Sequence, residues 1–259
     1  MSAKKDTIGR TILVTVLLCV ACSVVVSSAA VLLKPQQVAN KELDRKSNIL
    51  AAAGLGGNGV SVDEAFKKIT TKVVDLETGK FTDDVDPNTY DAAKASKDPA
   101  MSEALSRDED IASIKRQARY QTVYLVENEG QLDRIILPVK GYGLWSTLYG
   151  FMALEGDLNT VVGLGFYSHA ETPGLGGEVD NPNWKALWEG KKVYEEGTWD
   201  PELHLIKGSV DSSTPDAEHK VDGLSGATLT SNGVTHLVQF WMGKNGYAPF
   251  LKNLKAGEA

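Results

Sequence analysis

The hydrophobic pattern of this chain begins with one uninterrupted apolar stretch near its N-terminus. Residues 11–33 contain no charged residue and no proline. As a helix, this stretch would rise about 34 Å, which is enough to cross a hydrocarbon core of roughly 30 Å. The pattern therefore predicts a single transmembrane helix over residues 11–33, with residues 1–10 as a short terminus before it.

A cleaved signal peptide is the main alternative to an anchor. Lys4, Lys5 and Arg10 resemble the basic start of a signal peptide, and the small residues at 27–30 would suit a cleavage site. The apolar run is longer than the roughly 7–15 residues of a signal core and continues through Leu33. This length favours an uncleaved anchor. Basic residues on both sides of the stretch leave its orientation open.

Beyond the anchor, the polar and apolar positions predict two further regions, which together make an α+β fold. Residues 34–121 read as a helical and irregular extension. Its predicted elements are helices over residues 38–53 (closed by glycines at 54–57), 62–74 and 111–119, with polar irregular structure over 80–107.

Residues 122–259 alternate between apolar runs and turn signals, which is typical of strands joined by short connections. The predicted strands cover residues 123–126, 135–139, 149–154, 161–167 and 204–210, with a short helix over 183–190. Val234, Leu237 and Trp241 then recur at helical spacing. They predict an amphipathic helix that begins between Thr228 and Asn232, and so an α+β domain over 122–259.

Charge and cysteine content exclude several kinds of binding. The formal net charge is −7, so binding to nucleic acid or to an anionic membrane surface is not expected. Both cysteines, Cys19 and Cys22, lie inside the apolar stretch. The remainder of the chain thus has no thiolate ligand for a metal or an iron–sulfur cluster. A lipid attachment motif at Cys22 is weak, because Cys19 stands where an aliphatic residue is required.

One short motif carries specific chemistry. The string Asp222-Gly-Leu-Ser-Gly-Ala-Thr228 resembles the flavinylation motif, in which a flavin transferase esterifies FMN through its phosphate onto the final threonine. Ser225, Gly226 and Ala227 are small, so a bulky donor nucleotide has access to the backbone. A phosphate at the start of the following helix would meet free N–H groups and the favourable end of the dipole. An ordinary capped helix start is the alternative interpretation.

Two further strings accompany this motif. Residues 169–176 are dense in turn residues directly after a predicted strand, and residues 140–145 end in Trp145. With the threonine motif, they resemble the FMN-binding domain family over roughly residues 138–243. Together with the single N-terminal span, the chain resembles the C subunits (NqrC) of the sodium-translocating NADH:quinone oxidoreductase.

That resemblance implies an electron-carrying subunit with FMN attached by a phosphoester bond to Thr228. Electrons from NADH would arrive through FAD and iron–sulfur centres of other subunits, and would leave through flavins of the neighbouring membrane subunit to ubiquinone while sodium is pumped outward. The implied partners are the A, B, D, E and F subunits, a flavin transferase and membrane lipid. The implied location is the bacterial inner membrane, with the flavin domain on the periplasmic side.

The resemblance also implies roles for individual residues. The residues expected to line the edge of the flavin ring are Glu171, Thr172, Pro173, Gly174, Leu175 and Gly176. Trp145 is expected to stack on the ring or to belong to the core. Asp222 is expected to serve transferase recognition or to hold the loop, and His169 to be structural. No general acid, general base or metal ligand is expected, because the flavin itself carries the redox chemistry.

Two alternatives stay open at this point. The first is the equivalent flavoprotein of the Rnf ferredoxin:NAD complex, its G subunit, although the long segment over residues 54–121 favours NqrC. The second is a membrane-anchored sensor or scaffold that binds flavin reversibly. A third possibility, a lipid-anchored structural protein without cofactor, has the least support from the three strings.

Overall fold

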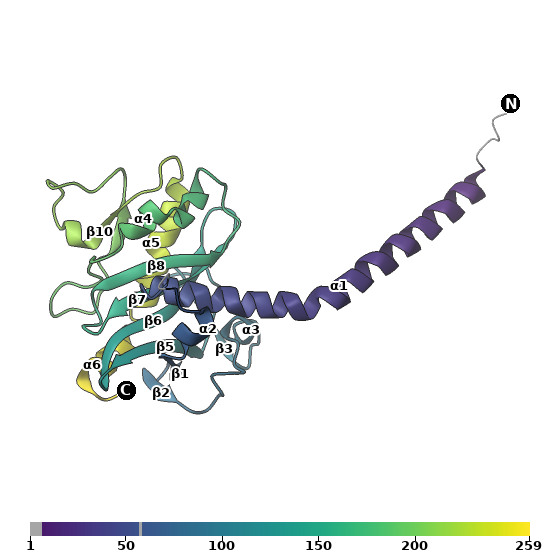
Figure 1. The fold of residues 1–259 in the computed structure, drawn as a ribbon. Helices are drawn as coiled ribbons and strands as arrows, with labels where there is room; N and C mark the ends of the chain where they lie inside the picture. The colour runs from purple at the N-terminus through teal and green to yellow at the C-terminus, as the bar shows by residue number, and fades with distance from the viewer. Residues whose placement is uncertain (1–6, 57–58) are drawn as a thin grey trace. The chain divides into compact units, whose positions relative to one another are not determined.

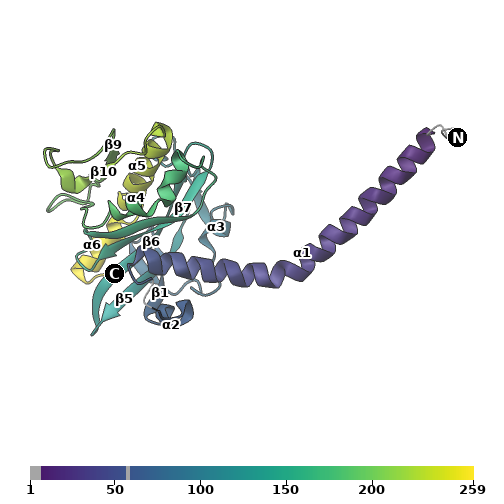
Figure 2. The same ribbon diagram turned by 45° about the horizontal axis from the view of Figure 1, so that its top comes forward.

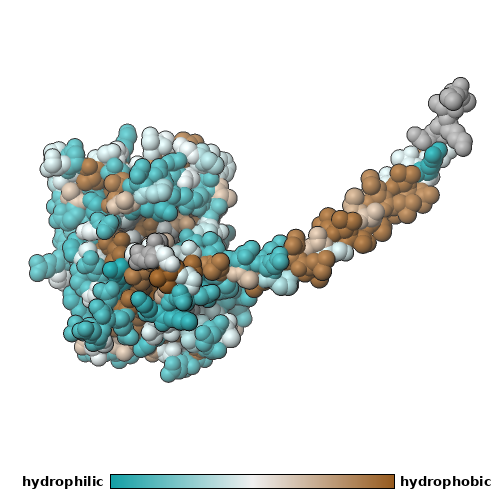
Figure 3. Space-filling view, viewed as in Figure 1, coloured by the Kyte–Doolittle hydropathy of each residue, from teal (hydrophilic) through white to brown (hydrophobic). Residues whose placement is uncertain are grey.

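The computed structural model describes residues 7–56 and 59–259. Residues 1–6 of the predicted terminus (1–10) and residue 57, the last of the predicted glycine stop (54–57), lie outside this range. The chain forms two compact units, residues 1–44 and 45–259. Helix α1 (Ile8–Ala52) carries the apolar stretch predicted to span a membrane. Pro35 lies within this helix, just after the apolar stretch. Figure 3 shows hydrophobic side chains covering α1 over this stretch.

The second unit is built on one six-stranded antiparallel sheet with strand order β2-β1-β5-β6-β7-β8 (Figure 1). Its strands are β1 (Ile69–Asp75), β2 (Lys80–Thr82), β5 (Tyr120–Asn128), β6 (Gln131–Tyr142), β7 (Thr147–Glu155) and β8 (Val161–Ser168). The two small sheets pair β3 (Ser102–Ala104) with β4 (Arg116–Ala118), and β9 (His204–Ile206) with β10 (Lys220–Asp222). The strands predicted over residues 123–126, 135–139, 149–154 and 161–167 thus lie within β5, β6, β7 and β8.

Short helices surround this sheet, together with one long helix, α5 (Figure 2). The other helices of the second unit are α2 (Val62–Phe66), α3 (Ala92–Ala95), α4 (Pro182–Ala186) and α6 (Ala248–Ala256), while η1 (Gly176–Asp180) and η2 (Ala217–His219) are 3₁₀ turns. Helix α5 (Thr228–Met242) begins where its amphipathic spacing predicted. Helix α6 was not among the predicted elements, although Tyr247, Phe250, Leu251 and Leu254 recur at helical spacing.

The sheet is buried on both faces, which explains the continuous apolar run in β6. Ile135 and Leu137 pack with α5 in one core cluster, whereas Ile136 packs in a second cluster with Ile49 and Leu50 from the end of α1. Successive strand residues point to opposite faces of a sheet. A run without polar gaps thus marks a central strand that is covered on both sides.

The helix predicted over residues 62–74 is wrong in its second half. Helix α2 ends at Phe66, and the following residues form β1, all of whose seven residues pair with β5. Ile69, Val73 and Val74 are β-branched and buried. Such residues favour a strand once a partner strand is available. The segment over residues 34–121 thus adds β1 and β2 to the main sheet.

The short helix predicted over residues 111–119 is also wrong. The carboxylate of Asp110 accepts hydrogen bonds from the backbone N–H groups of Ile114 and Lys115, at 2.7 and 2.8 Å. Ser113 and Lys115 have positive φ angles of 54° and 65°, which an α-helix excludes. This turn leads into β4. The polar segment over residues 80–107, predicted to be irregular, contains β2, α3 and β3. The strand predicted over residues 204–210 is only the three-residue β9.

Gly233 allows α5 to approach the end of β6 closely. A Cβ at this position would lie 2.4 Å from the carbonyl oxygen of Tyr142 and 3.0 Å from Cα of Gly143. We expect Gly233→Ala to lower the free energy of unfolding by about 1–3 kcal/mol, as overpacking does, although alanine normally stabilises a helix. Chemical denaturation of the detergent-solubilised chain measures this change. The exposed neighbour Asn232→Ala is the control, and equal stability of the two variants would contradict the close approach.

Candidate functional site

The flavinylation motif joins the end of β10 to the start of α5. The Asp222 carboxylate accepts a hydrogen bond from the N–H of Val210 at 2.7 Å, and its carbonyl accepts one from Nε1 of Trp184 at 2.9 Å. A Cβ on Gly223 would lie only 2.3 Å from the carbonyl oxygen of Ile206. The first half of the motif is therefore held tightly against β9 and α4.

The second half of the motif turns outward. Gly226 has a φ angle of +71°, in the left-handed region that favours glycine. Ser225 and Thr228 are exposed. Ser231, one turn into α5, accepts a hydrogen bond from the N–H of Leu224 at 3.0 Å and donates one to the carbonyl of Ala227 at 3.1 Å. The threonine thus lies on a supported loop with its side chain toward solvent.

Thr228 is the first residue of α5, and Ala227 is the residue that caps the helix. Alanine has no side-chain acceptor, and no side chain makes a capping hydrogen bond there. The first N–H groups of a helix have no partner within the helix. This end of α5 therefore has the donors and the dipole that suit a phosphate group.

A buried carboxylate lies under this loop. Glu171 is 5% exposed and comes from the connection after β8. Its carboxylate accepts hydrogen bonds from the N–H groups of Leu144, Trp145 and Ser146 at 3.1, 3.0 and 3.2 Å. It also accepts one from the hydroxyl of Thr230 at 2.8 Å. The connection between β6 and β7 is in this way tied to the first turn of α5.

The ionised state of Glu171 suits this arrangement. Burial acts to raise the pKa of the Glu171 carboxyl, but the hydrogen bonds from Trp145, Thr230, Ser146 and Leu144 outweigh burial and lower the pKa below its usual value. The side chain is consequently a carboxylate at neutral pH, and all of its contacts are with donors.

The rest of the 169–176 segment forms a tight turn beside Glu171. His169 accepts a hydrogen bond from the N–H of Glu171 at its Nδ1, and its Nε2 lies 2.8 Å from Oδ2 of Asp180. The carbonyl of Thr172 accepts hydrogen bonds from the N–H groups of Leu175 and Gly177. Thr172, Pro173, Gly174 and Leu175 are exposed, and Gly174 has a φ angle of +77°.

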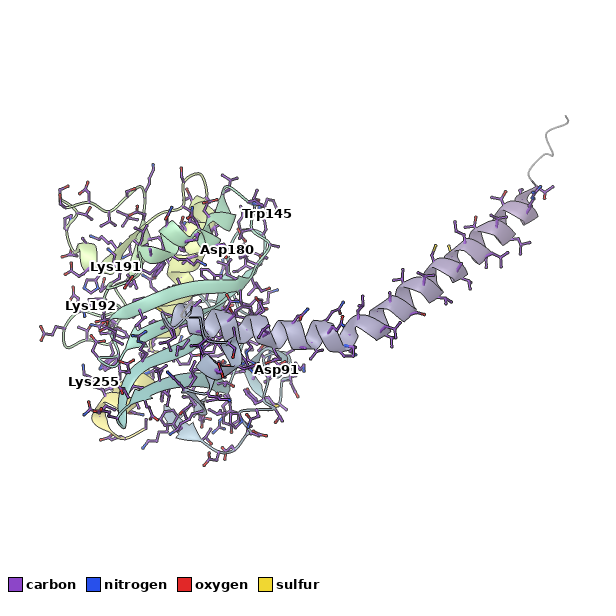
Figure 4. All side chains as sticks on the ribbon, in the orientation of Figure 1. Asp91, Trp145, Asp180, Lys191, Lys192 and Lys255 are labelled. Carbon is purple, nitrogen blue, oxygen red and sulfur yellow. The ribbon has the colours of Figure 1, made fainter. Side chains whose placement is uncertain are left out.

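Each of the three segments that meet at Glu171 or at the motif carries exposed apolar side chains. We call Leu144, Trp145, Leu175 and Leu229 the apolar rim; their exposed fractions are 36, 65, 44 and 58%. A Cβ on Gly226 would lie 3.0 Å from Cδ2 of Leu175, which places Leu175 against the motif. Figure 4 shows Trp145 at the edge of the domain. Large exposed apolar groups that gather at one place are typical of a ligand or partner site.

The structure thus brings together the three strings that the sequence singled out. Trp145 and the 169–176 segment meet through Glu171, and the segment meets the motif through Leu175. Sequence reasoning missed Thr230 and Ser231, two buried polar residues in the first turn of α5. Thr230 occupies the same helix face as Val234, Leu237 and Trp241. A polar residue on that apolar face was the available signal.

Two cavities of about 500 and 480 Å³ lie elsewhere in the second unit. The first lies between the end of α1, β8 and α4, and the second adjoins Lys192, Trp199 and His219. Neither of them is lined by residues of the motif or of the apolar rim. Thr228 itself is exposed, so a group attached to it would begin at the surface of the domain.

Comparison with known proteins identifies a domain family over this part of the chain. The FMN-binding domain family matches residues 143–243, a range that contains the rim, Glu171 and the whole motif. Fold, site and the apolar stretch of α1 together define a flavin-binding protein with a candidate membrane anchor.

Relatives define the family further. The chain is 59% identical to the C subunit of the Na+-translocating NADH-quinone reductase of Pseudomonas aeruginosa, over 99% of this chain and 100% of the relative. It is 46% identical to the same subunit of Vibrio alginolyticus, over 100% of this chain and 99% of the relative. The chain belongs to the family of C subunits of this oxidoreductase complex. The first of the predicted families is thereby confirmed.

Solved structures give the same result. The crystal structure of Shewanella oneidensis NqrC matches with a TM-score of 0.75 at 36% identity, over 83% of this chain and 97% of that one. The corresponding protein from Parabacteroides distasonis matches with a TM-score of 0.65 over 85% of this chain and 96% of that one. At 24% identity, the second match supports the fold alone.

Proposed function

We propose that this subunit carries electrons through an FMN attached by a phosphoester bond to Thr228. The observation that carries the proposal is an exposed threonine at an uncapped helix start, inside a domain of the FMN-binding family. Its place in the complex follows from the family: it receives electrons that originate at NADH and passes them toward the quinone.

The residues at the site fit this cofactor. Thr228 supplies the hydroxyl for the ester, and the glycine at 226 gives a flavin transferase access to it. The free N–H groups at the start of α5 would donate hydrogen bonds to the phosphate oxygens. The apolar rim offers Trp145 and Leu175 to the flat ring.

The cofactor and the chain would have separate roles in electron transfer. FMN, when bound, supplies the capacity to accept and release electrons. The chain holds it by one covalent bond, orients it between rim residues and leaves it near the surface. Reversible binding would need an enclosing pocket for affinity, whereas a covalent bond keeps the cofactor on an open site. Electron transfer of this kind needs no catalytic acid or base from the chain.

We further propose that α1 anchors the chain in the bacterial inner membrane with the flavin domain on the periplasmic side. The apolar stretch and membership in a membrane complex support the anchor, and the family implies the side. Partners would be the A, B, D, E and F subunits, with a flavin transferase for maturation. A reporter that is active only outside the cytoplasm, fused after Ala259, should be active. A silent but well-expressed fusion would contradict the orientation.

The role in the complex is tested in membranes of a strain that lacks this subunit. Wild-type protein should restore sodium-dependent NADH:quinone activity, and Thr228→Ala should restore none at equal expression. Full activity with the alanine variant would show that electrons do not pass through a flavin at this residue. Activity that never depends on the subunit would contradict the electron-carrying role itself.

A further inference from the structure

The hydrogen bonds of Glu171 connect three parts of the chain that are distant in sequence. The β6–β7 connection contributes the N–H groups of residues 144–146, α5 contributes the hydroxyl of Thr230, and the β8–η1 connection contributes Glu171 itself. We call this set the Glu171 node. It is buried, since Glu171 and Thr230 are 5 and 0% exposed.

The surrounding backbone is shaped to admit this carboxylate. A Cβ on Gly143 would lie 2.6 Å from Oε1 of Glu171. A Cβ on Gly176 would lie 2.8 Å from Oε2 of Glu171 and 2.5 Å from Oγ1 of Thr230. Real Cβ atoms do not make such contacts without rearrangement. The two glycines therefore leave room for the node on two sides.

The node lies under the apolar rim. Leu144 and Trp145 are rim residues whose own N–H groups bond to Glu171, and Leu229 lies between Thr228 and Thr230 in the chain. Leu175 directly precedes Gly176, which contacts the node. Leu144 and Trp145 thus belong to the node. Leu229 directly precedes a residue of the node, and Leu175 directly precedes a residue that contacts it.

We propose that Glu171 is a positioning residue for the flavin: its buried carboxylate sets the spacing between the rim and Thr228, and so determines how the attached ring is enclosed. This inference rests on the proposed attachment of FMN at Thr228. Glu171 acts through Leu144, Trp145 and the first turn of α5. Its own oxygens are occupied by four donors from the chain.

A carboxylate suits this place because all four partners donate to it. Ionised acceptors make shorter and stronger hydrogen bonds than neutral ones. In Glu171→Gln, the amide oxygen could keep the N–H groups that bond to Oε1. The new NH₂ group would take the place of Oε2, which accepts from the hydroxyl of Thr230 and, at 3.3 Å, from the N–H of Leu144. The hydrogen bonds would lose their charge assistance, and the Thr230 hydroxyl would have to turn from donor to acceptor. The hold between the loop at residues 144–146 and α5 would therefore weaken, and the rim would open to water.

The test compares Glu171→Gln with wild type in the full-length protein, expressed with a flavin transferase. Fluorescence of the denatured band measures covalent loading, and emission of the native protein per loaded flavin measures enclosure. In Glu171→Gln, we expect loading to be retained. The native emission should rise toward the denatured value, and the flavin midpoint potential should shift.

Asp75→Asn is the matched control for lost stability. Asp75 is a buried carboxylate on β1 that accepts hydrogen bonds from Arg119 at 2.8 Å and from the N–H of Glu77 at 3.1 Å. This variant removes a buried carboxylate that lies away from the rim. It should leave native emission and potential at the wild-type values.

A second pair of variants keeps the test valid if Glu171→Gln does not fold. Thr230→Val removes one donor at nearly constant shape and should change the native emission, whereas Thr230→Ser keeps the hydroxyl and should restore it. Loaded Glu171→Gln or Thr230→Val protein with wild-type emission and potential would overturn the positioning role. A wild-type band without covalent flavin would instead overturn the attachment at Thr228, so the two failures are distinguishable.

Discussion

Thr228→Ala is expected to abolish covalent flavin and to leave the fold intact. The side chain is exposed at the first position of α5, and no hydrogen bond of the loop depends on its hydroxyl, since Ser231 supports the motif. Exposed substitutions of this kind change stability by within about 0.5 kcal/mol. The measurement is flavin fluorescence of the fully denatured protein in a gel, after expression with a flavin transferase. Wild type should be fluorescent and the variant dark.

Ser225→Ala is the control for this loss. Ser225 is a second exposed hydroxyl of the same motif, three residues earlier. If the transferase needs only an accessible hydroxyl, Ser225 would take the flavin in the absence of Thr228, and Thr228→Ala would stay fluorescent. If position 228 is the attachment site, Ser225→Ala should stay fluorescent and Thr228→Ala should not.

Trp241→Ala is expected to lower the free energy of unfolding by about 3–5 kcal/mol, as the loss of a buried tryptophan does. Trp241 is 1% exposed, and its ring lies 5.2 Å from that of Tyr247 and 5.4 Å from that of Phe240. Its Nε1 also donates a hydrogen bond to the carbonyl of Lys140 at 2.7 Å. Removal of the ring leaves a cavity between α5 and β6 and a buried carbonyl without its donor.

Trp145→Ala provides the contrast for this prediction. Trp145 is 65% exposed in the apolar rim, so its loss should change stability by within about 0.5 kcal/mol. It should instead alter the emission of the bound flavin. Denaturation of both variants in detergent measures the difference. Equal stability of Trp241→Ala and Trp145→Ala would contradict the core position of Trp241.

The parts of the fold that follow from local pattern were predictable. Three features follow directly from the order of polar and apolar residues. They are the apolar stretch of α1, the strands β5 to β8 and the start of α5. β1 was not predictable in this way. Its residues also fit a short helix, and only the pairing with β5 decides for a strand. The turn at Asp110 depends on a side-chain carboxylate that accepts hydrogen bonds from N–H groups, as the carbonyls of a helix would otherwise do.

The candidate site likewise has a part that the local sequence predicts and a part that it does not. Thr228 and its loop are contiguous, so the motif alone located them. The hydrogen bonds of Glu171 reach residues 144–146 and Thr230, 25 to 27 positions before it and 59 after it. No local pattern contains that information, because three of the four partners are backbone N–H groups, which nearly every residue type provides. Direct contact of the 171–176 residues with the flavin ring stays a prediction.

Peptide mass spectrometry of the denatured, protease-digested protein tests the central claim most directly. We expect the peptide containing Thr228 to carry the mass of one FMN less one water, and fragmentation to place this mass on Thr228 and not on Ser225. An unmodified Thr228 peptide from protein expressed with an active flavin transferase, or the same mass on another residue, would contradict the attachment on which the proposed electron carrier depends.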